Sequence, residues 1–162
     1  MVSNLMIAFI QDNFISKKEC RSLIKFYNLN KNKAVSFRDV FPLNVINFGD
    51  IKNRLDKKSK ELNGSKVDWM QIVRWPVGSK QNLHFDNAKE GTKLASIVYL
   101  NDEFEGGETY FKEGITISPK KGRVLFFDGN YFKHGVNKVN KLERFVIAAW
   151  YNSINDYSII CE

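Results

Sequence analysis

The stretch Leu83-His84-Phe85-Asp86-Asn87 decides how the rest of the sequence is interpreted. On a β-strand, side chains two positions apart point to the same side, so a strand here would present His84 and Asp86 together. An imidazole and a carboxylate are two of the three ligands in the 2-His-1-carboxylate set that holds non-haem Fe(II). The other histidine of the chain, His134, is the candidate for the third ligand.

A positively charged residue follows the second histidine and favours iron over other metals. Arg144 lies in an apolar run that ends at Trp150, and Phe145 and Ile147 alternate with it as in a strand. Zinc also binds histidine and carboxylate, so it is the main rival metal. A zinc site does not require an arginine that points inward. Beside an iron site, a guanidinium can bind a ligand carboxylate through two parallel hydrogen bonds, so Arg144 favours iron. The other interpretation of Arg144 is a surface salt bridge within residues 141–144.

The sequence from residue 67 onward has a pattern typical of short β-strands separated by turns. Val67 to Trp75 alternates, and Leu94 to Leu100 is a nearly continuous apolar run, as in a buried strand. About eight such strands predict a mainly β fold, a jelly roll (double-stranded β-helix, cupin-like), rather than a parallel α/β sheet. The strands are expected at 67–75, 83–87, 94–100, 108–112, 115–118, 124–127 and 144–150.

The first part of the sequence predicts two helices that buttress this sheet. Ser16 and Glu19 form an S-x-x-E capping box, in which each side chain binds an otherwise free backbone N–H, so a helix is expected over 17–28. A second helix is expected over 51–63, with Asp50 as its cap.

The remaining N-terminal segments give weaker patterns. Residues 1–15 fit a short apolar strand or an extended lead-in, and 34–48 fit a strand or an irregular stretch. We expect one α+β domain over 1–162, with N-terminal helical support in 1–66 and the jelly-roll core in 67–155.

Composition narrows the class of protein. The 43% hydrophobic and 14% aromatic content is typical of a globular chain. The net charge of +7 fits either a patch for nucleic acid or acidic peptide, or a solvated lysine-rich surface. The lysines are scattered among acidic residues, which favours the solvated surface. Cys20 and Cys161 give no metal spacing, and the apolar start is too short for a signal peptide or membrane span, so we expect a cytoplasmic protein.

The residues from Gln71 to Trp150 together resemble the prolyl 4-hydroxylase-like branch of the 2-oxoglutarate/Fe(II)-dependent dioxygenases. The resemblance covers about half of the chain, and its combination of motifs is specific. The matching residues are Trp75-Pro76-x-Gly78, His84-Phe85-Asp86-Asn87, Tyr99-Leu100-Asn101, Glu105-Gly106-Gly107-Glu108-Thr109, Pro119-x-x-Gly122, Leu125-Phe126-Phe127, His134-Gly135-Val136, Arg144 and Trp150.

The resemblance implies roles for individual residues. His84, Asp86 and His134 would bind iron, and Arg144 would pair with the distal carboxylate of 2-oxoglutarate. Tyr99 and Thr109 would add hydroxyl hydrogen bonds to the same carboxylate. Trp150 would pack behind the co-substrate. Trp75 would also line the co-substrate site, at a position where the family usually has Tyr.

The implied activity is the oxidative decarboxylation of 2-oxoglutarate to succinate and CO2, coupled to hydroxylation of an unactivated C–H bond with O2. Peptidyl proline in a peptide or protein is the first expectation for the substrate, and ascorbate is a candidate additional cofactor. The loops 76–82 and 87–93 are expected to select the substrate. Two alternatives stay open: the same chemistry on a free amino acid or other small molecule, and a non-catalytic basic binding module on the same fold.

Overall fold

The computed structural model describes residues 8–45, 48–62, 66–86 and 92–152. This part of the chain contains twelve strands, two α-helices and one 3-10 turn, so the mainly β prediction is confirmed. No helix in these ranges is long and apolar enough to cross a membrane.

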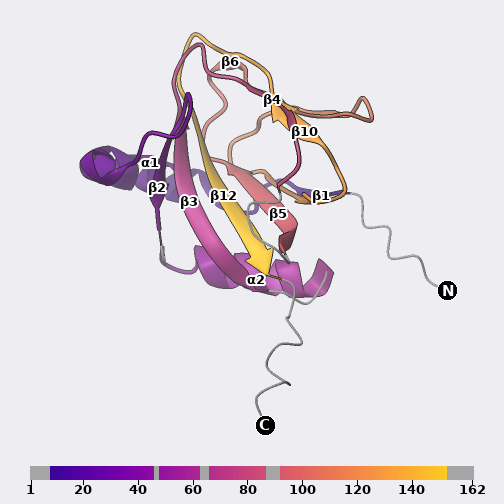
Figure 1. The fold of residues 1–162 in the computed structure, drawn as a ribbon. Helices are drawn as coiled ribbons and strands as arrows, with labels where there is room; N and C mark the ends of the chain where they lie inside the picture. The colour runs from indigo at the N-terminus through magenta and orange to yellow at the C-terminus, as the bar shows by residue number, and fades with distance from the viewer. Residues whose placement is uncertain (1–7, 46–47, 63–65, 87–91, 153–162) are drawn as a thin grey trace, which may run out of the picture.

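The largest element is a six-stranded antiparallel sheet in which β3, β12 and β5 lie side by side (Figure 1). β12 pairs with β3 and β5 along nearly its whole length and is therefore a central strand. The strand order is β1-β9-β5-β12-β3-β2, with bounds β1 Ala8–Gln11, β2 Phe41–Asn44, β3 Val67–Trp75, β5 Thr92–Tyr99, β9 Val124–Asp128 and β12 Arg144–Asn152.

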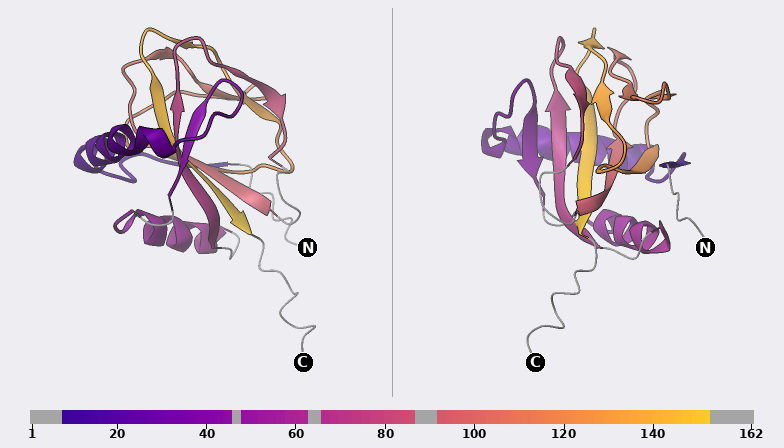
Figure 2. Two further views of the ribbon diagram at one scale, coloured as in Figure 1. Left: turned by 60° about the vertical axis from the view of Figure 1, so that its left-hand side comes forward. Right: turned by 45° about the vertical axis from the view of Figure 1, so that its right-hand side comes forward.

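A smaller four-stranded sheet packs against one face of the large sheet (Figure 2). Phe111 and Val136 of the small sheet share an apolar cluster with Val73 and Phe127 of the large sheet, which gives the two layers of the jelly roll. The small sheet has the order β4-β10-β7-β8, with bounds β4 Gln81–His84, β10 His134–Val136, β7 Thr109–Phe111 and β8 Thr116–Ile117, and a separate pair joins β11 Val139–Asn140 to β6 Glu105–Gly106.

Two helices cover the opposite face of the large sheet. The first, α1 Lys17–Asn30, is followed by the 3-10 turn Lys31–Lys33, and the second is α2 Ile51–Leu62. Leu23 of α1 and Leu55 of α2 are both fully buried in a cluster with apolar residues of this sheet face. The helices therefore support the sheet as predicted, and they leave its other face to the small sheet.

The helix predictions agree with the structure to within two residues. The predicted capping box is confirmed: the Ser16 N–H donates to Glu19 Oε2 at 2.7 Å, and the Glu19 N–H donates to Ser16 Oγ at 3.1 Å. The helix it begins ends at Asn30 rather than at residue 28, and the second helix ends at Leu62 within the described residues.

One strand differs from its prediction. The strand expected over 83–87 begins at Gln81 and ends at His84, so Asp86 follows the strand instead of lying on it. The strand interpretations of 1–15 and 34–48 agree with the structure, since β1 and β2 lie there as the two edge strands of the large sheet. The ambiguous stretch 34–48 contains β2, and the loop residues 87–91 lie outside the described part of the chain.

Candidate functional site

Three side chains with metal-ligand chemistry meet where β4 and β10 pair. His84 and His134 are opposite each other in the register of the two strands, and their ring centroids are 4.3 Å apart. Asp86 Oδ1 lies 3.2 Å from His84 Nε2 and 3.4 Å from His134 Nε2. The three candidate ligand atoms lie within 4.8 Å of one another, which is the spacing of a single metal site.

Asp86 reaches this site because a backbone hydrogen bond joins the chain after β4 to a neighbouring loop. The Asp86 N–H donates to the Gly129 carbonyl oxygen at 2.8 Å. A Cβ atom on Gly129 would come within 2.7 Å of Asp86 Cβ, so a larger residue at 129 would displace the carboxylate. The i, i+2 argument from the sequence therefore brought the correct residues together, but a loop contact replaces the expected strand geometry.

Hydrogen bonds on the far side of each ligand fix its orientation. His84 Nδ1 lies 2.8 Å from the Asn82 carbonyl oxygen, and His134 Nδ1 lies 3.2 Å from the Phe132 carbonyl oxygen. A proton on each Nδ1, donated to the carbonyl oxygen, would leave each Nε2 to coordinate a metal ion, and outer contacts of this kind set the tautomer of metal-bound histidines.

The outer oxygen of Asp86 is also held in place. Trp150 Nε1 donates to Asp86 Oδ2 at 3.2 Å, and the Trp150 ring stacks on Trp69 with centroids 4.5 Å apart. Trp69 Nε1 in turn donates to Asn44 Oδ1 at 3.0 Å. We predicted Trp150 behind the co-substrate, and its contact with a candidate metal ligand was not predicted.

Electrostatics keep the carboxylate ready to bind a cation. Burial alone would raise the pKa of Asp86, but hydrogen bonds from His134 and His84 outweigh burial and hold this pKa well below its usual range. Burial opposes protonation of His84, whereas its hydrogen bonds to Asp86 and to the Asn82 carbonyl raise the pKa of that ring. A metal cation at the centre of the three groups would interact favourably with this ionised carboxylate.

The second half of the site is a buried arginine at the start of β12. Arg144 is 0% exposed, and its guanidinium carbon lies 4.8 Å from the Trp75 ring centroid and 5.4 Å from the Tyr99 ring centroid. Its Nη2 is 3.5 Å from Thr109 Oγ1, whereas Nε and Nη1 have no hydrogen-bond partner among the residues that the structure describes. Burial lowers the pKa of Arg144, since nearby aromatic rings replace water without supplying an anion.

The residues predicted around Arg144 are at the same place. Tyr99 and Thr109 are fully buried, and their hydroxyl oxygens are 2.7 Å apart. Trp75 is opposite Arg144 in the β3–β12 register, and its Nε1 is another buried donor without a partner. The tryptophan that departs from the family pattern therefore supplies an N–H donor near the arginine. A buried positive charge with unused donors beside it is the chemistry of a carboxylate site.

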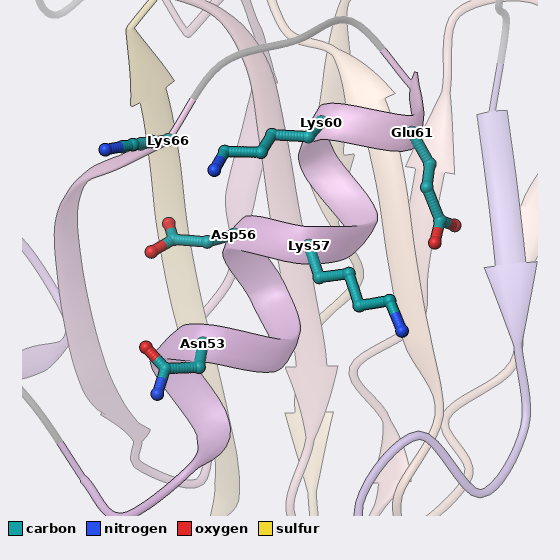
Figure 3. A pocket seen from close by; sticks show the side chains of 6 residues that line it. All are labelled: Asn53, Asp56, Lys57, Lys60, Glu61 and Lys66. Atoms are coloured by element: carbon teal, nitrogen blue, oxygen red, sulfur yellow. The ribbon is translucent and has the colours of Figure 1, made fainter.

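One cavity of about 600 Å³ contains the metal-ligand cluster and Arg144 together. Its volume is in the range of small-molecule sites, and its walls are mainly apolar. A second hollow lies along α2, where Lys57 and Glu61 point away from Asn53, Asp56 and Lys60 (Figure 3). Neither the metal-ligand cluster nor Arg144 lines this hollow, so we place the functional site in the first cavity.

The residues in this cavity fit both Fe(II) and 2-oxoglutarate. His84, Asp86 and His134 form a 2-His-1-carboxylate set, which leaves coordination positions for other ligands. Arg144 has two unpartnered nitrogens for a carboxylate. The site therefore has the donors required by a metal ion at one end and by an anionic ligand at the other.

Sequence comparisons place the chain in a known group. The profile of the 2OG-Fe(II) oxygenase superfamily matches residues 70–152. Prolyl 4-hydroxylase 2 of Arabidopsis thaliana is 26% identical over 172 aligned residues, covering 78% of this chain and 58% of that protein. Human prolyl 3-hydroxylase 2 is 39% identical over 64 residues, covering 35% of this chain and 9% of the relative. The chain thus spans less than two thirds of the length of these relatives.

Solved structures show the same fold. A viral collagen prolyl hydroxylase from Paramecium Bursaria Chlorella virus-1, in its 2OG complex, matches with a TM-score of 0.78 and 22% identity, covering 96% of this chain and 100% of that one. A prolyl hydroxylase from Trichoplax adhaerens, bound to a hypoxia inducible factor peptide fragment, matches with a TM-score of 0.74 and 18% identity, covering 98% and 89%. The profile match over half of the sequence and the shared jelly roll show that the chain belongs to the 2OG-Fe(II) oxygenase superfamily.

Proposed function

We propose that this protein hydroxylates prolyl residues in peptides or proteins, using Fe(II), 2-oxoglutarate and O2. The observation that carries the proposal is the pairing, within one cavity, of the His84, Asp86 and His134 cluster with a fully buried Arg144 whose Nε and Nη1 are unpartnered. A buried charge without an anion is costly, and a ligand carboxylate would relieve that cost.

Each part of the chain has a defined task in this reaction. His84, Asp86 and His134 would hold the iron, and Arg144 would bind the distal carboxylate of 2-oxoglutarate as a bidentate fork. When bound, iron with 2-oxoglutarate and O2 supplies the oxidation of a C–H bond, with succinate and CO2 as co-products.

The surrounding residues orient the co-substrate and exclude water. The Tyr99 and Thr109 hydroxyl groups already bind each other and can turn toward a carboxylate on Arg144. The apolar floor formed by Val73, Ala95 and Val146 keeps solvent away from the reacting centre. These groups hold the reactants in place and leave the oxidation to the metal and its co-substrate.

The relatives support proline as the substrate residue. Curated proteins that align with this chain include prolyl 3- and 4-hydroxylases, and one matching structure holds a peptide. At the mouth of the cavity, Phe37 and Phe85 are 55% and 39% exposed, which suits contact with an extended peptide. A free amino acid would use less of this surface, and a non-catalytic module would have no use for the unpartnered Arg144.

Succinate formation tests the proposal. The protein is loaded with Fe(II) under anaerobic conditions and then given O2 and 2-oxoglutarate, with and without proline-containing peptides. We expect peptide-dependent succinate and a mass gain of one oxygen on the peptide. Omission of ascorbate from parallel reactions tests whether repeated turnover depends on it.

Each other outcome of this assay points to a different function. Turnover of free proline but not of peptides would favour the small-molecule alternative. Iron binding without succinate under any condition would contradict an oxygenase activity and favour the binding module, whose nucleic-acid affinity would fall steeply with salt.

A further inference from the structure

A short hairpin at the mouth of the cavity has a charged tip. The Val35 N–H donates to the Pro42 carbonyl oxygen at 3.0 Å, and Phe37 and Val40 exchange backbone hydrogen bonds of 3.0 and 3.1 Å. The two residues of the tip are Arg38 and Asp39, and Arg38 has φ +54°. A two-residue hairpin turn commonly has a positive φ at this position, and here an arginine adopts it instead of a glycine.

The Arg38 side chain faces the site without being used by the protein. It lines the same cavity as His84 and Asp86. Among the described residues, no carboxylate lies within ion-pair distance of its guanidinium, whose carbon is 5.4 Å from the Phe37 ring centroid. The bonding capacity of this guanidinium is therefore available to a bound molecule.

The charges around Arg38 favour an anionic partner. Lys80 and Asp39 are exposed and also line the cavity, so these three side chains carry one net positive charge at the mouth. The whole chain carries +7, which favours approach of an acidic segment. Arg144 lies deeper and is fully buried, and it is assigned to 2-oxoglutarate, so Arg38 can serve a different carboxylate.

We infer that Arg38 is a specificity-determining residue, which selects peptide substrates that carry an Asp or Glu side chain close to the hydroxylated proline. The carboxylate would bind the Arg38 guanidinium while the neighbouring apolar residues of the peptide contact Phe37 and Phe85. The inference rests on the proposed prolyl hydroxylation and adds a requirement for substrate charge. Asp39, beside Arg38 at the tip, would repel the same carboxylate and so limit its affinity.

Three peptides that differ in one residue test this inference. Each contains the same proline, flanked by Glu, Gln or Lys, and both kcat/KM for succinate formation and direct binding by fluorescence anisotropy are measured. For the native protein we expect kcat/KM and affinity to fall in the order Glu, Gln, Lys. In Arg38→Gln the advantage of the Glu peptide over the Gln peptide should shrink by about fivefold, as for one partly exposed charge contact.

Matched variants separate this contact from general effects. Arg38→Lys keeps the charge and should retain most of the preference, and Asp39→Asn should increase it. Arg21→Gln removes the same charge from the exposed face of α1, away from the cavity, and should leave the preference as in the native protein.

The outcomes distinguish this inference from the proposed function. Peptide hydroxylation without a charge preference, or with a preference unchanged in Arg38→Gln, overturns the role of Arg38 and leaves prolyl hydroxylation standing. Arg38-dependent binding of the Glu peptide without succinate formation contradicts the proposed reaction and supports the acidic-segment site. An equal loss in Arg38→Gln and Arg21→Gln would show that net charge alone, and no specific contact, favours acidic peptides.

Discussion

The arginines on the two faces of the six-stranded sheet differ in their ion-pair and hydrogen-bond partners. On the helix side, Arg54 of α2 forms ion pairs with Glu19 and Asp50 and donates to the Phe14 carbonyl oxygen at 3.0 Å. On the cavity side, Arg144 is more deeply buried, yet it has two nitrogens without a partner. One arginine joins elements of the fold, whereas the other is held ready for a ligand.

The two faces therefore differ in their main contribution: the helix side to folding stability, the cavity side to ligand binding. The helix side buries apolar residues such as Leu23 and Leu55 completely, and burial of this kind is the main source of folding free energy. Among the described residues, both sides contain buried polar atoms without a hydrogen-bond partner, including Arg54 Nε and Ser59 Oγ on the helix side. On the cavity side such atoms belong to Arg144 and Trp75, and leaving them unsatisfied costs folding free energy in the absence of a ligand. Substitutions on the two faces should therefore affect different measurements.

The largest expected effect is on the cavity side, in Asp86→Ala. Loss of the only carboxylate of the candidate metal site should reduce succinate formation by about a thousandfold or more, because the two histidines alone would hold iron poorly. The fold should survive, since Asp86 lies outside the apolar clusters. Circular dichroism and thermal unfolding of the metal-free protein check the second part, and near-native turnover would remove Asp86 from the site.

On the helix side, Leu55→Ala should produce the reverse pattern. Leu55 is 0% exposed, and its truncation should lower the free energy of unfolding by about 3 kcal/mol through lost burial and a new cavity. Succinate formation per folded molecule should stay close to native at low temperature. Urea unfolding measures the first quantity, and a selective loss of turnover without loss of stability would break the comparison.

Arg144→Met should separate ligand binding from stability on the cavity side itself. The concentration of 2-oxoglutarate needed for half-maximal turnover should rise by about a hundredfold, because charge-assisted hydrogen bonds of roughly 1.5–3 kcal/mol are lost. Iron affinity should change far less. The ligand-free protein should unfold at the same temperature or higher, since Met fills similar space without a buried charge. A clear drop in ligand-free stability would assign Arg144 a structural role.

The smallest effect tests the outer contact of the metal ligand. Trp150→Phe keeps an aromatic ring beside Trp69 but removes the donor to Asp86, so iron affinity should fall by about tenfold. Trp69→Phe is the matched control, because Trp69 bonds to Asn44 and not to a candidate ligand. Equal iron affinities in the two variants would show that the Trp150 hydrogen bond does not position Asp86.

The fold was largely predictable because local signals and burial agree in this sequence. The capping box marks the start of α1, and the apolar alternation over Val67–Trp75 coincides with β3. The short strands β6, β10 and β11 were not predicted, because two or three residues carry no readable periodicity. The hairpin before β2 also escaped prediction, since Arg38 at positive φ lacks the usual glycine signal.

The candidate site was predictable where side-chain chemistry is distinctive. The structure brings together, in or beside one cavity, the residues to which the resemblance assigned roles, and those roles stay predictions: His84, Asp86, His134, Arg144 and the Tyr99–Thr109 pair. Contacts formed by backbone atoms gave no signal: the Gly129 carbonyl that holds Asp86 could come from any residue type. The Arg38 tip was missed because an exposed arginine in a loop is ordinary in sequence.

The candidate metal ligands come from segments that only the folded chain brings together. His84 and His134 meet through the β4–β10 pairing, and Asp86 depends on the Gly129 loop. An unfolded chain has no such cluster, so iron binds the native state selectively and shifts the folding equilibrium by thermodynamic linkage. At a free iron concentration of about a hundred times the dissociation constant, the gain is about 2.7 kcal/mol. Iron supply would therefore affect how stably the protein is folded, as well as whether it is active.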